Sequence, residues 1–359
     1  MKILIVFNHP APYKVKLFNE LTKYADIDVI FERNKAKNRE TEFYGNQNYK
    51  FNVVDVKLHN FGDENVFGFG LTNYLKKNYT KYDSIIMNGY STVSEMSAIN
   101  FLVKNNIKFT LMINGGIIHQ DKKLKKKIKT HYISSAASYL CPNEESIQYL
   151  LHYGADQSKI KLYPYSNIFE TDIRNKPVSE EVRKQILLKY HLPIGPLFIN
   201  PNQFIPRKNN EQLLEIFKNR TENLLLIGNG PLRNKYQEFI KVNKCENIKI
   251  INFLNQAQLR EVMQVSTCLI TLSKEDIFGH TILEALSNGI PVISSDKVIS
   301  ALNSIRNDVN GYIVSLDKYD QINDAIEKVN NLKFDDIVSS IENHTIEESA
   351  KKIIESLQQ

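Results

Sequence analysis

The sequence predicts an α/β protein built from two doubly wound domains, each with a parallel sheet covered by helices on both faces. Short continuous apolar runs recur along the chain, and amphipathic helical segments separate them. Such runs are typical of parallel strands that are buried on both faces. The length of 359 residues suits two domains of ordinary size.

The composition is that of a globular protein with substantial cores. Hydrophobic residues make up 42% of the chain, with 14 Gly and 11 Pro. Cys141, Cys245 and Cys268 are far apart and form no Cys-x-x-Cys pair, so we expect core thiols in a reducing compartment. The net charge of +6 permits an anionic partner without naming one.

The ends of the chain and its hydropathy give an expected location. Met1-Lys2 leads directly into a strand-like run, so no secretory signal is expected. No apolar stretch approaches the roughly 20 residues that span a bilayer. We therefore expect a cytoplasmic protein, either soluble or peripheral to the inner face of the cell membrane.

The N-terminal half alternates expected strands and helices. Strands are expected at Ile3–Phe7, Asp28–Phe31, Asn52–Val56, Ser84–Met87 and Lys108–Ile113, and helices at Lys14–Tyr24 and Thr92–Lys104. Ligands of parallel sheets bind outside the carboxyl ends of the strands. The candidate site loops are therefore Asn8–Tyr13, Asn88–Tyr90 and Asn114–Gln120.

Several residues of these loops are candidates for ligand contact. Gly115 and Gly116 follow Asn114 and a strand, where glycine lets the backbone approach a ligand closely. Lys14, at a helix start, is a candidate for a phosphate or an acceptor, or else a surface lysine. His119 either reaches the site from its loop or is a solvated histidine, and His9 leaves the same choice open.

The C-terminal half repeats the pattern. Expected strands are Pro196–Asn200, Leu224–Ile227, Ile248–Phe253, Cys268–Leu272 and Ile290–Ile293, and Ile346–Leu357 is expected to be a final amphipathic helix. Arg207 and Lys208 lie in the loop after the first of these strands, where a guanidinium and an ammonium suit phosphate oxygens. Gly228 and Gly230 follow the second and allow close backbone approach, or form a bare turn.

The stretch from Ser273 to Asp296 organises this half. An acidic loop with Asp276 leads through Phe278–Gly279 into a helix over His280–Ser287, which Gly289 and Pro291 end. The amide groups at such a helix start hold anions such as a diphosphate. Asp276 and Glu284 supply paired acceptors for sugar or ribose hydroxyls, or else are surface charges.

Asp276-x7-Glu284, followed by the Gly-x-Pro-Val ending at Gly289–Val292, resembles the Glu-x7-Glu motif of glycosyltransferase family 4. The resemblance implies the GT-B fold and a retaining transfer from a nucleotide-sugar. One departure is that the first acid is Asp276 instead of Glu, which leaves the sugar open. The resemblance covers about 195–315 strongly and 1–168 loop by loop.

The family's pattern implies roles for the matching residues. Asp276 would contact the donor sugar, Glu284 the ribose, and Arg207 with Lys208 the diphosphate, at the place of the family's Gly-Arg-x-x-x-x-Lys-Gly loop. Asn114 takes the position of a histidine that faces the reaction centre in many members. The remaining donor contacts would come from Gly228 and Gly230, Leu254 near the base-contacting loop, and Phe278 with Gly279.

The resemblance also implies which domain binds the acceptor and which binds the donor. Residues 1–168, with helix 343–359 packing back on them, would bind the acceptor, and residues 169–342 the donor. A hexose or N-acetylhexosamine would pass from a nucleoside-diphosphate sugar, such as a UDP-sugar, to a glycan hydroxyl with retained configuration. Cations replace a metal, so no metal and no other cofactor is expected. Asp276 and His119 are the candidates for holding the sugar.

The segment Lys122–Lys129 contains six lysines. Leu124, Ile128 and Tyr132 recur every four residues within and after it, which indicates a basic amphipathic helix. It suits an anionic lipid surface, as a lipid-linked acceptor in capsule or other cell-wall glycan synthesis would require. The alternative is a charged outer face that Leu124 and Ile128 dock on the sheet. Without interleaved aromatics, no nucleic acid is expected.

Two other functions stay open. A nucleotide-sugar epimerase of the same fold would release a new nucleotide-sugar without an acceptor. A non-catalytic glycan- or membrane-binding protein would bind no nucleotide-sugar at all.

Overall fold

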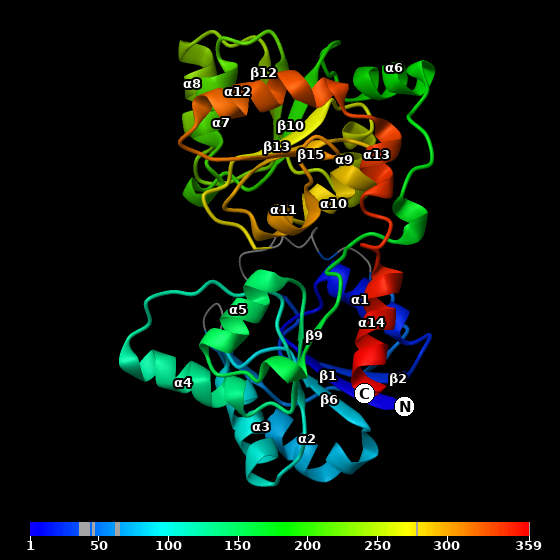
Figure 1. Ribbon diagram of the computed structural model, residues 1–359, viewed down its shortest axis with the longest axis vertical. Coiled ribbons are helices and arrows are strands. Elements are labelled where there is room, and N and C mark those ends of the chain that lie inside the picture. The colour runs from blue at the N-terminus through cyan, green and yellow to red at the C-terminus, as the bar shows by residue number, and fades with distance from the viewer. Residues whose placement is uncertain (36–43, 45–46, 62–64, 278, 359) are drawn as a thin grey trace. The chain divides into compact units, whose positions relative to one another are not determined.

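The computed structural model describes residues 1–35, 44, 47–61, 65–277 and 279–358 (Figure 1). The chain forms two compact units. Unit 1 comprises Met1–Asn167 and His344–Gln359, and unit 2 comprises Ile168–Asn343. Each unit contains one parallel sheet, so the predicted fold class, two doubly wound α/β domains, is confirmed.

Unit 1 contains a seven-stranded parallel sheet, called sheet 1, with the order β3-β2-β1-β6-β7-β8-β9. Side chains of β1 alternate between its faces: Leu4 and Val6 join the core under α2 and α3, whereas Phe7 stacks edge-on against Phe18 of α1. The strands are β1 (Lys2–Phe7), β2 (Asp26–Phe31), β3 (Asn52–Val53), β6 (Ser84–Met87), β7 (Thr110–Met112), β8 (Ser138–Cys141) and β9 (Ile160–Leu162).

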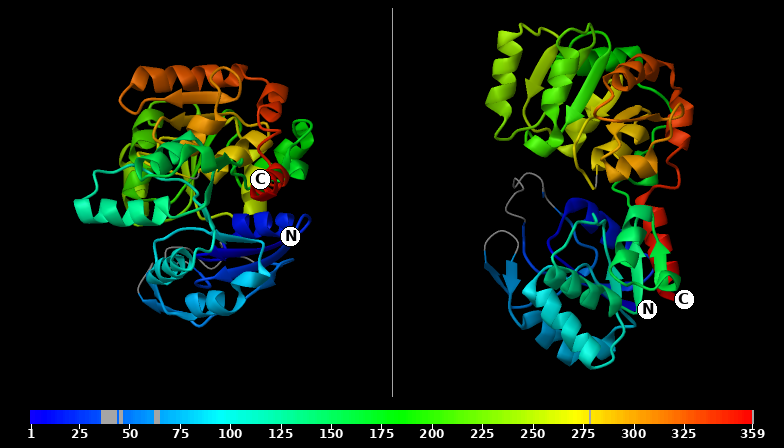
Figure 2. Two further views of the ribbon diagram at one scale, coloured as in Figure 1. Left: turned by 60° about the horizontal axis from the view of Figure 1, so that its bottom comes forward. Right: turned by 60° about the vertical axis from the view of Figure 1, so that its left-hand side comes forward.

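Helices cover both faces of sheet 1. The C-terminal helix α14 lies beside α1, as both figures show (Figures 1 and 2). The helices are α1 (Pro12–Leu21), α2 (Gly70–Asn78), α3 (Val93–Lys104), α4 (Lys123–Ser134), α5 (Glu144–His152) and α14 (Ile346–Gln358), with a hairpin of β4 (His59–Phe61) and β5 (Asn65–Phe67). A capping box between Thr92 and Glu95 fixes the start of α3.

Unit 2 contains a six-stranded parallel sheet, called sheet 2, with the order β12-β11-β10-β13-β14-β15. Leu197 and Ile199 of β10 face one core and Phe198 between them faces the other, so helices cover both faces. The strands are β10 (Leu197–Pro201), β11 (Asn223–Ile227), β12 (Ile248–Ile251), β13 (Cys268–Thr271), β14 (Val292–Ser295) and β15 (Gly311–Val314).

The helices of unit 2 divide between the two cores. The side of Leu197 carries α6 (Glu180–Lys189), α9 (Gln256–Met263), α10 (His280–Ser287), α11 (Ile299–Ser304) and α13 (Phe334–Ser339). The side of Phe198 carries α7 (Asn210–Phe217), α8 (Arg233–Val242) and α12 (Tyr319–Lys328).

The predicted elements differ from the observed ones mainly at their ends. The helix expected from Lys14 begins at Pro12, because proline suits the first turn of a helix. The strand expected over Asn52–Val56 covers only Asn52–Val53. The three cysteines are free and buried, as predicted.

Candidate functional site

The carboxyl edge of sheet 2 brings two predicted site loops together. Strand β10 pairs with β11 on one side and with β13 on the other. The chain leaves these two strands in opposite directions, and α/β sheets bind ligands in the crevice at such a switch point. The loops after β10 and β13 carry Arg207 with Lys208 and Asp276, respectively.

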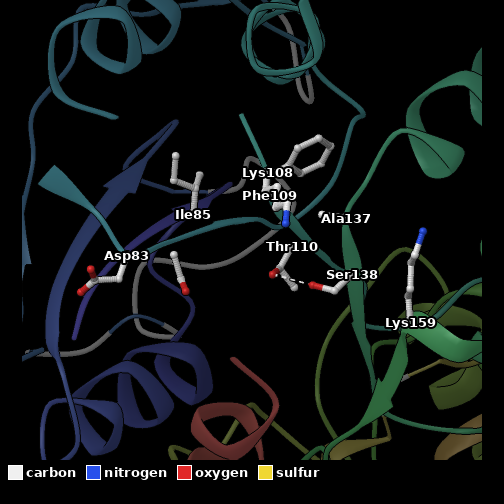
Figure 3. A pocket seen from close by; sticks show the side chains of 9 residues that line it. Asp83, Ile85, Lys108, Phe109, Thr110, Ala137, Ser138 and Lys159 are labelled. Carbon is white, nitrogen blue, oxygen red and sulfur yellow. Dashed lines mark hydrogen bonds between the residues drawn. The ribbon is translucent and has the colours of Figure 1, made fainter. Parts of the chain in front are cut away.

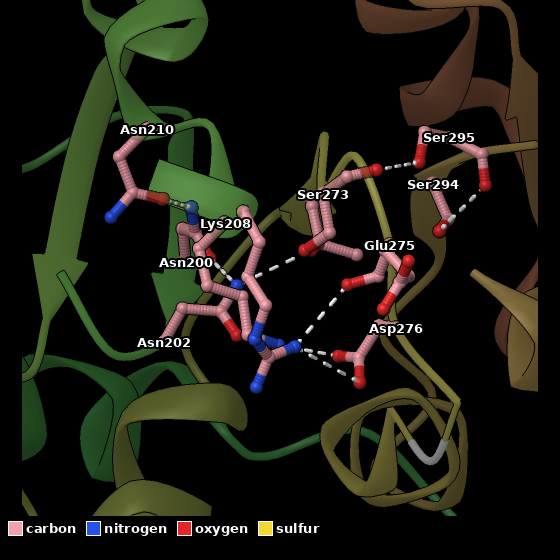
Figure 4. A network of polar contacts seen from close by, with 11 residues as sticks. Asn200, Asn202, Lys208, Asn210, Ser273, Glu275, Asp276, Ser294 and Ser295 are labelled. Atoms are coloured by element: carbon pink, nitrogen blue, oxygen red, sulfur yellow. Dashed lines mark hydrogen bonds and ion pairs between the residues drawn. The ribbon is translucent and has the colours of Figure 1, made fainter. Parts of the chain in front are cut away.

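Arg207, Lys208 and Asp276 form one cluster, called the Lys208 cluster. Figure 4 shows Lys208 and Asp276 in this cluster. The Lys208 ammonium donates to the Asp276 carboxylate. The Arg207 Nη1 atom lies 3.8 Å from Asp276 Oδ1 and donates to the carbonyl oxygen of Glu275 at 3.2 Å. The Lys208 side chain is only 8% exposed, whereas that of Arg207 is 46% exposed. One cation is therefore fixed and the other remains accessible.

A buried polar network supports this edge, and the sequence pattern did not reveal it. Asn200 donates to Asn210 at 2.9 Å, and Asn202 donates to both Asn200 and Thr271. The Ser295 hydroxyl donates to the Ser273 carbonyl oxygen at 2.5 Å. These bonds tie the ends of β10, β13 and β14 together. The sequence signal that could have indicated this network is the polar residue at the end of each apolar run.

The helix α10 begins beside the Lys208 cluster in the sequence. Gly279 is its N-cap, with φ of +37°, and an added Cβ would fall 2.2 Å from the hydroxyl oxygen of Ser300. The first amides of a helix have no partner within it, so this start suits an anion. Phe278, the other residue predicted here, lies outside the described residues.

Glu284 lies in the middle of α10 and contacts the first residue of α9, directly after the loop that follows β12. The Gln256 Nε2 atom donates to Glu284 Oε1 at 3.0 Å. Leu254, in that loop, is half-buried and packs against the core. The residue that the resemblance assigns to the ribose is therefore adjacent to the loop that it assigns to the base.

Gly228 and Gly230 allow two loops to pack closely. A Cβ on Gly228 would lie 2.2 Å from the Asn202 carbonyl oxygen, and one on Gly230 would lie 2.6 Å from that of Phe204. Their φ values of +147° and +153° also favour glycine. The contact of these glycines with the donor stays a prediction. Arg233 was not among the predicted residues, and its Nη1 atom donates to the Gly228 carbonyl oxygen at 2.8 Å.

The side chains of Lys14 and Asn114 contact each other at the carboxyl edge of sheet 1. Lys14 is 0% exposed, so the alternative that it is a surface lysine is wrong. Its Nζ atom donates to Asn114 Oδ1 at 2.6 Å. Asn114 in turn donates to Asn88 Oδ1 at 3.2 Å, which connects the loops after β6 and β7.

The other residues predicted in unit 1 occupy different settings. Gly115 has a φ of +142°, and a Cβ on Gly116 would fall 2.4 Å from the ring of Tyr149. His119 is exposed. His9 follows β1, and its Nδ1 atom lies 3.2 Å from the Tyr44 hydroxyl. Sugar contact by His119 therefore stays a prediction.

The basic segment forms the helix α4, but the docking alternative for it is wrong. Leu124 is 70% and Ile128 40% exposed, so these side chains do not attach the helix to the sheet. Tyr132 and Ile133, which are buried in the core of unit 1, attach the helix instead. Lys129 adds polar contacts, because its Nζ atom pairs with Asp121 Oδ2 at 2.7 Å and donates to the Tyr153 hydroxyl at 3.1 Å. The hydrogen bond from Lys129 keeps the pKa of Asp121 below its usual value.

Two further features concern the surface. Among the described residues, no helix combines the length and apolar character needed to cross a bilayer. A hollow of about 450 Å³ lies at the amino ends of β6, β7 and β8, where Thr110 and Ser138 hydrogen-bond at 2.9 Å (Figure 3). Lys108 and Lys159 also line it. It occupies the edge opposite to the predicted site loops.

The comparisons with known proteins agree with this architecture. Residues 192–353 match the family model described as glycosyl transferases group 1. The uncharacterised glycosyltransferase MJ1059 of Methanocaldococcus jannaschii is 27% identical over an alignment of 212 residues, which covers 55% of this chain and 50% of that protein. The chain thus spans about half the length of this curated relative.

Solved structures of glycosyltransferases match over the whole length of the chain, and two of them serve as examples. Anabaena Alr3699/HepE in complex with UDP has a TM-score of 0.78 at 14% identity and covers 100% of both chains. The lipopolysaccharide outer core galactosyltransferase WaaB has a TM-score of 0.69 at 17% identity, over 100% of this chain and 99% of that one. The chain therefore has the GT-B fold of these glycosyltransferases, and residues 192–353 are similar to glycosyl transferases group 1.

Proposed function

We propose that the protein is a retaining glycosyltransferase of family 4 that moves a hexose or N-acetylhexosamine from a UDP-sugar to a glycan hydroxyl. The observation that carries the proposal is the Lys208 cluster at the switch point of sheet 2, beside the start of α10. The HepE structure, which holds UDP, and the group 1 match over 192–353 support it.

Charge is the main chemical contribution of this site. The leaving diphosphate gains negative charge as the bond to the sugar breaks, and preorganised cations and amides stabilise that charge most. Arg207 and Lys208 supply the cations, and the first turn of α10 supplies the amides. The transfer then needs no metal. In the retaining reaction the diphosphate accepts the proton of the acceptor hydroxyl on the same face of the sugar.

Asp276 has two roles in this proposal. It holds the Lys208 ammonium in place, and its carboxylate accepts hydrogen bonds from the hydroxyls of the donor sugar. Glu284 accepts those of the ribose, next to Gln256 at the start of α9. The acceptor binds to unit 1, whose carboxyl edge carries Asn88 and Asn114.

The acceptor is proposed to be lipid-linked and to belong to capsule or other cell-wall glycan synthesis, as the relation to WaaB suggests. Helix α4 supports this role, because it exposes Leu124 and Ile128 among lysines. Apolar side chains that insert among headgroups and lysines that attract anionic lipid together bind a membrane surface. The protein would then be a peripheral protein of the inner face of the membrane.

Donor binding and product analysis test the function. The purified protein is screened by thermal shift against UDP- and GDP-sugars, and each stabilising donor is incubated with and without glycan acceptors. We expect stabilisation by a UDP-sugar, acceptor-dependent transfer with retained configuration, and unchanged rates in EDTA. A new nucleotide-sugar formed without acceptor would identify an epimerase. Stabilisation by none of the donors would identify a non-catalytic binding protein.

Vesicle flotation tests the membrane contact. The variant Leu124→Ser/Ile128→Ser is compared with Leu188→Ser, a control that removes a leucine of α6 that is 75% exposed. On vesicles containing phosphatidylglycerol, the α4 variant should lose most binding and the control should keep it. Equal binding of all three proteins, or binding to phosphatidylcholine vesicles alone, would contradict a role of α4.

A further inference from the structure

Lys14 has an unusual environment for a lysine. Its Nζ atom lies 4.7 Å from the ring centre of Tyr165, 5.6 Å from that of Phe7 and 5.8 Å from that of Tyr163, which together form an aromatic cage. Among the described residues, no carboxylate pairs with it. Burial lowers the pKa of Lys14 to about 7, although ring faces favour the charged form.

The Lys14 Nζ atom contacts the Asn114 carboxamide and, at 3.5 Å, the Tyr163 hydroxyl, which contacts the same carboxamide. Asn114 Oδ1 accepts from Lys14 Nζ at 2.6 Å and from the Tyr163 hydroxyl at 3.1 Å, while Asn114 Nδ2 donates to Asn88 Oδ1 at 3.2 Å. A protonated lysine has only hydrogens to offer, so it selects the oxygen of the carboxamide. Asn114 itself is partly exposed at the end of β7.

We propose that Lys14 is a positioning residue, which fixes the carboxamide of Asn114 with its oxygen inward and an amide N–H toward the substrate side of the carboxyl edge. The inference rests on the proposed function, in which this edge binds the acceptor. An N–H at this point donates to an oxygen of the substrate, whereas a reversed carboxamide would present an acceptor atom. A buried amine without a carboxylate is unfavourable for folding, so its presence here calls for such a role.

Protonation links this arrangement to pH. A neutral amine has a lone pair, so it tolerates either orientation of Asn114, whereas the ammonium tolerates only one. Within the part of the chain that the structure describes, titratable groups near Lys14 include Tyr13, Tyr163 and Tyr165, with Cys141 next to Tyr163. Burial raises the pKa values of Tyr163, Tyr165 and, to about 12, Cys141, so those three stay neutral near pH 7.

The test uses the variants Lys14→Met and Asn114→Ala, alone and together. Methionine is unbranched and apolar, so it fills the cage without the amine. We expect Lys14→Met to lower kcat about tenfold or more, with donor KM and UDP affinity within about twofold and Tm unchanged or higher. The pH profile of kcat should show an inflection near pH 7 in the wild type, from the titration of Lys14, and no such inflection in Lys14→Met. In the Asn114→Ala background, Lys14→Met should have no further effect, as coupled residues require.

A matched control and a second readout make the result decisive. Lys16→Met makes the same change at a partly exposed lysine of α1 and should leave kcat unchanged. The side-chain amide signals of Asn114 in ¹⁵N NMR spectra should titrate near pH 7 in the wild type and not in Lys14→Met. Equal kcat values, additive effects, or an amide titration that survives in Lys14→Met would overturn the proposal. Failure of the wild type to transfer sugar would refute only the proposed function, because the NMR titration needs no activity.

Discussion

Replacing the acid of the Lys208 cluster should strengthen binding of UDP while it slows transfer. In the structure, the Lys208 ammonium donates to Asp276, and this ammonium is the group that binds the diphosphate in the proposed function. The variant Asp276→Asn removes this competing charge and keeps the shape. It also weakens the proposed contact with the donor sugar, so the rate of transfer should fall.

The magnitude follows from the geometry of one ammonium between two anions. Two hydrogen bonds of about 2.8 Å place the anions about 5 Å apart across the nitrogen. Their repulsion is then about 1 to 3 kcal/mol for effective dielectric constants of about 80 to 20. Removing it should tighten UDP binding by about 5- to 150-fold. Lys208→Met should weaken UDP binding by at least this factor, because it leaves Asp276 uncompensated beside the diphosphate.

Isothermal titration of UDP into the wild type and three variants measures these effects. Glu275→Gln is the matched control, because it removes the same charge from an exposed neighbour that does not hold Lys208. Its affinity should stay within about twofold of the wild type at ~0.15 M salt, where exposed charges are screened. Weaker binding by Asp276→Asn, or equal effects of Asp276→Asn and Glu275→Gln, would refute the reasoning.

Two other predictions concern single carboxylates. Glu284→Gln should weaken binding of UDP about tenfold or more but leave binding of inorganic pyrophosphate unchanged, because only the nucleotide has a ribose. Competition titrations measure both affinities. An equal loss of affinity for the two ligands would place Glu284 at the diphosphate instead. Burial and the neighbouring Glu95 raise the pKa of Glu32 to about 8, so the folded chain keeps a proton that the unfolded chain loses near pH ~4.3. Stability from this group is therefore present below that pH and is lost as pH rises toward 8, by up to about 1.4 kcal/mol per pH unit. Glu32→Gln should flatten the fall in urea midpoint between pH 5 and pH 8, and an unchanged slope would contradict this assignment.

The sequence was sufficient to predict the helices and strands that have a regular local pattern of hydrophobic residues. Apolar runs such as Ser84–Met87 become strands with the predicted bounds, and α10 spans His280–Ser287 as expected. Each of these elements is determined by a hydrophobic pattern and by nearby capping or breaking residues. The fold class follows from their alternation along the chain.

What the sequence did not reveal depends on contacts between distant residues. The bond between Lys14 and Asn114 spans 100 residues, and the one between Lys208 and Asp276 spans 68. Only the strand order of each sheet brings such pairs together. Helix α4 is a further example of what the sequence did not reveal. Periodicity places Leu124 on the apolar face of this helix but does not indicate that the side chain is exposed. The side chains that attach the helix to the core are Tyr132 and Ile133. Lys129, which the pattern had assigned to the charged surface, pairs with Asp121 and is only 14% exposed.

A crystal structure of the protein with UDP tests the central claim most directly. We predict that the diphosphate lies within hydrogen-bond distance of the Arg207 guanidinium and the Lys208 ammonium, against the first amides of α10, with Glu284 on the ribose. A nucleotide bound outside the carboxyl edge of sheet 2, or a diphosphate that contacts neither cation, would contradict it.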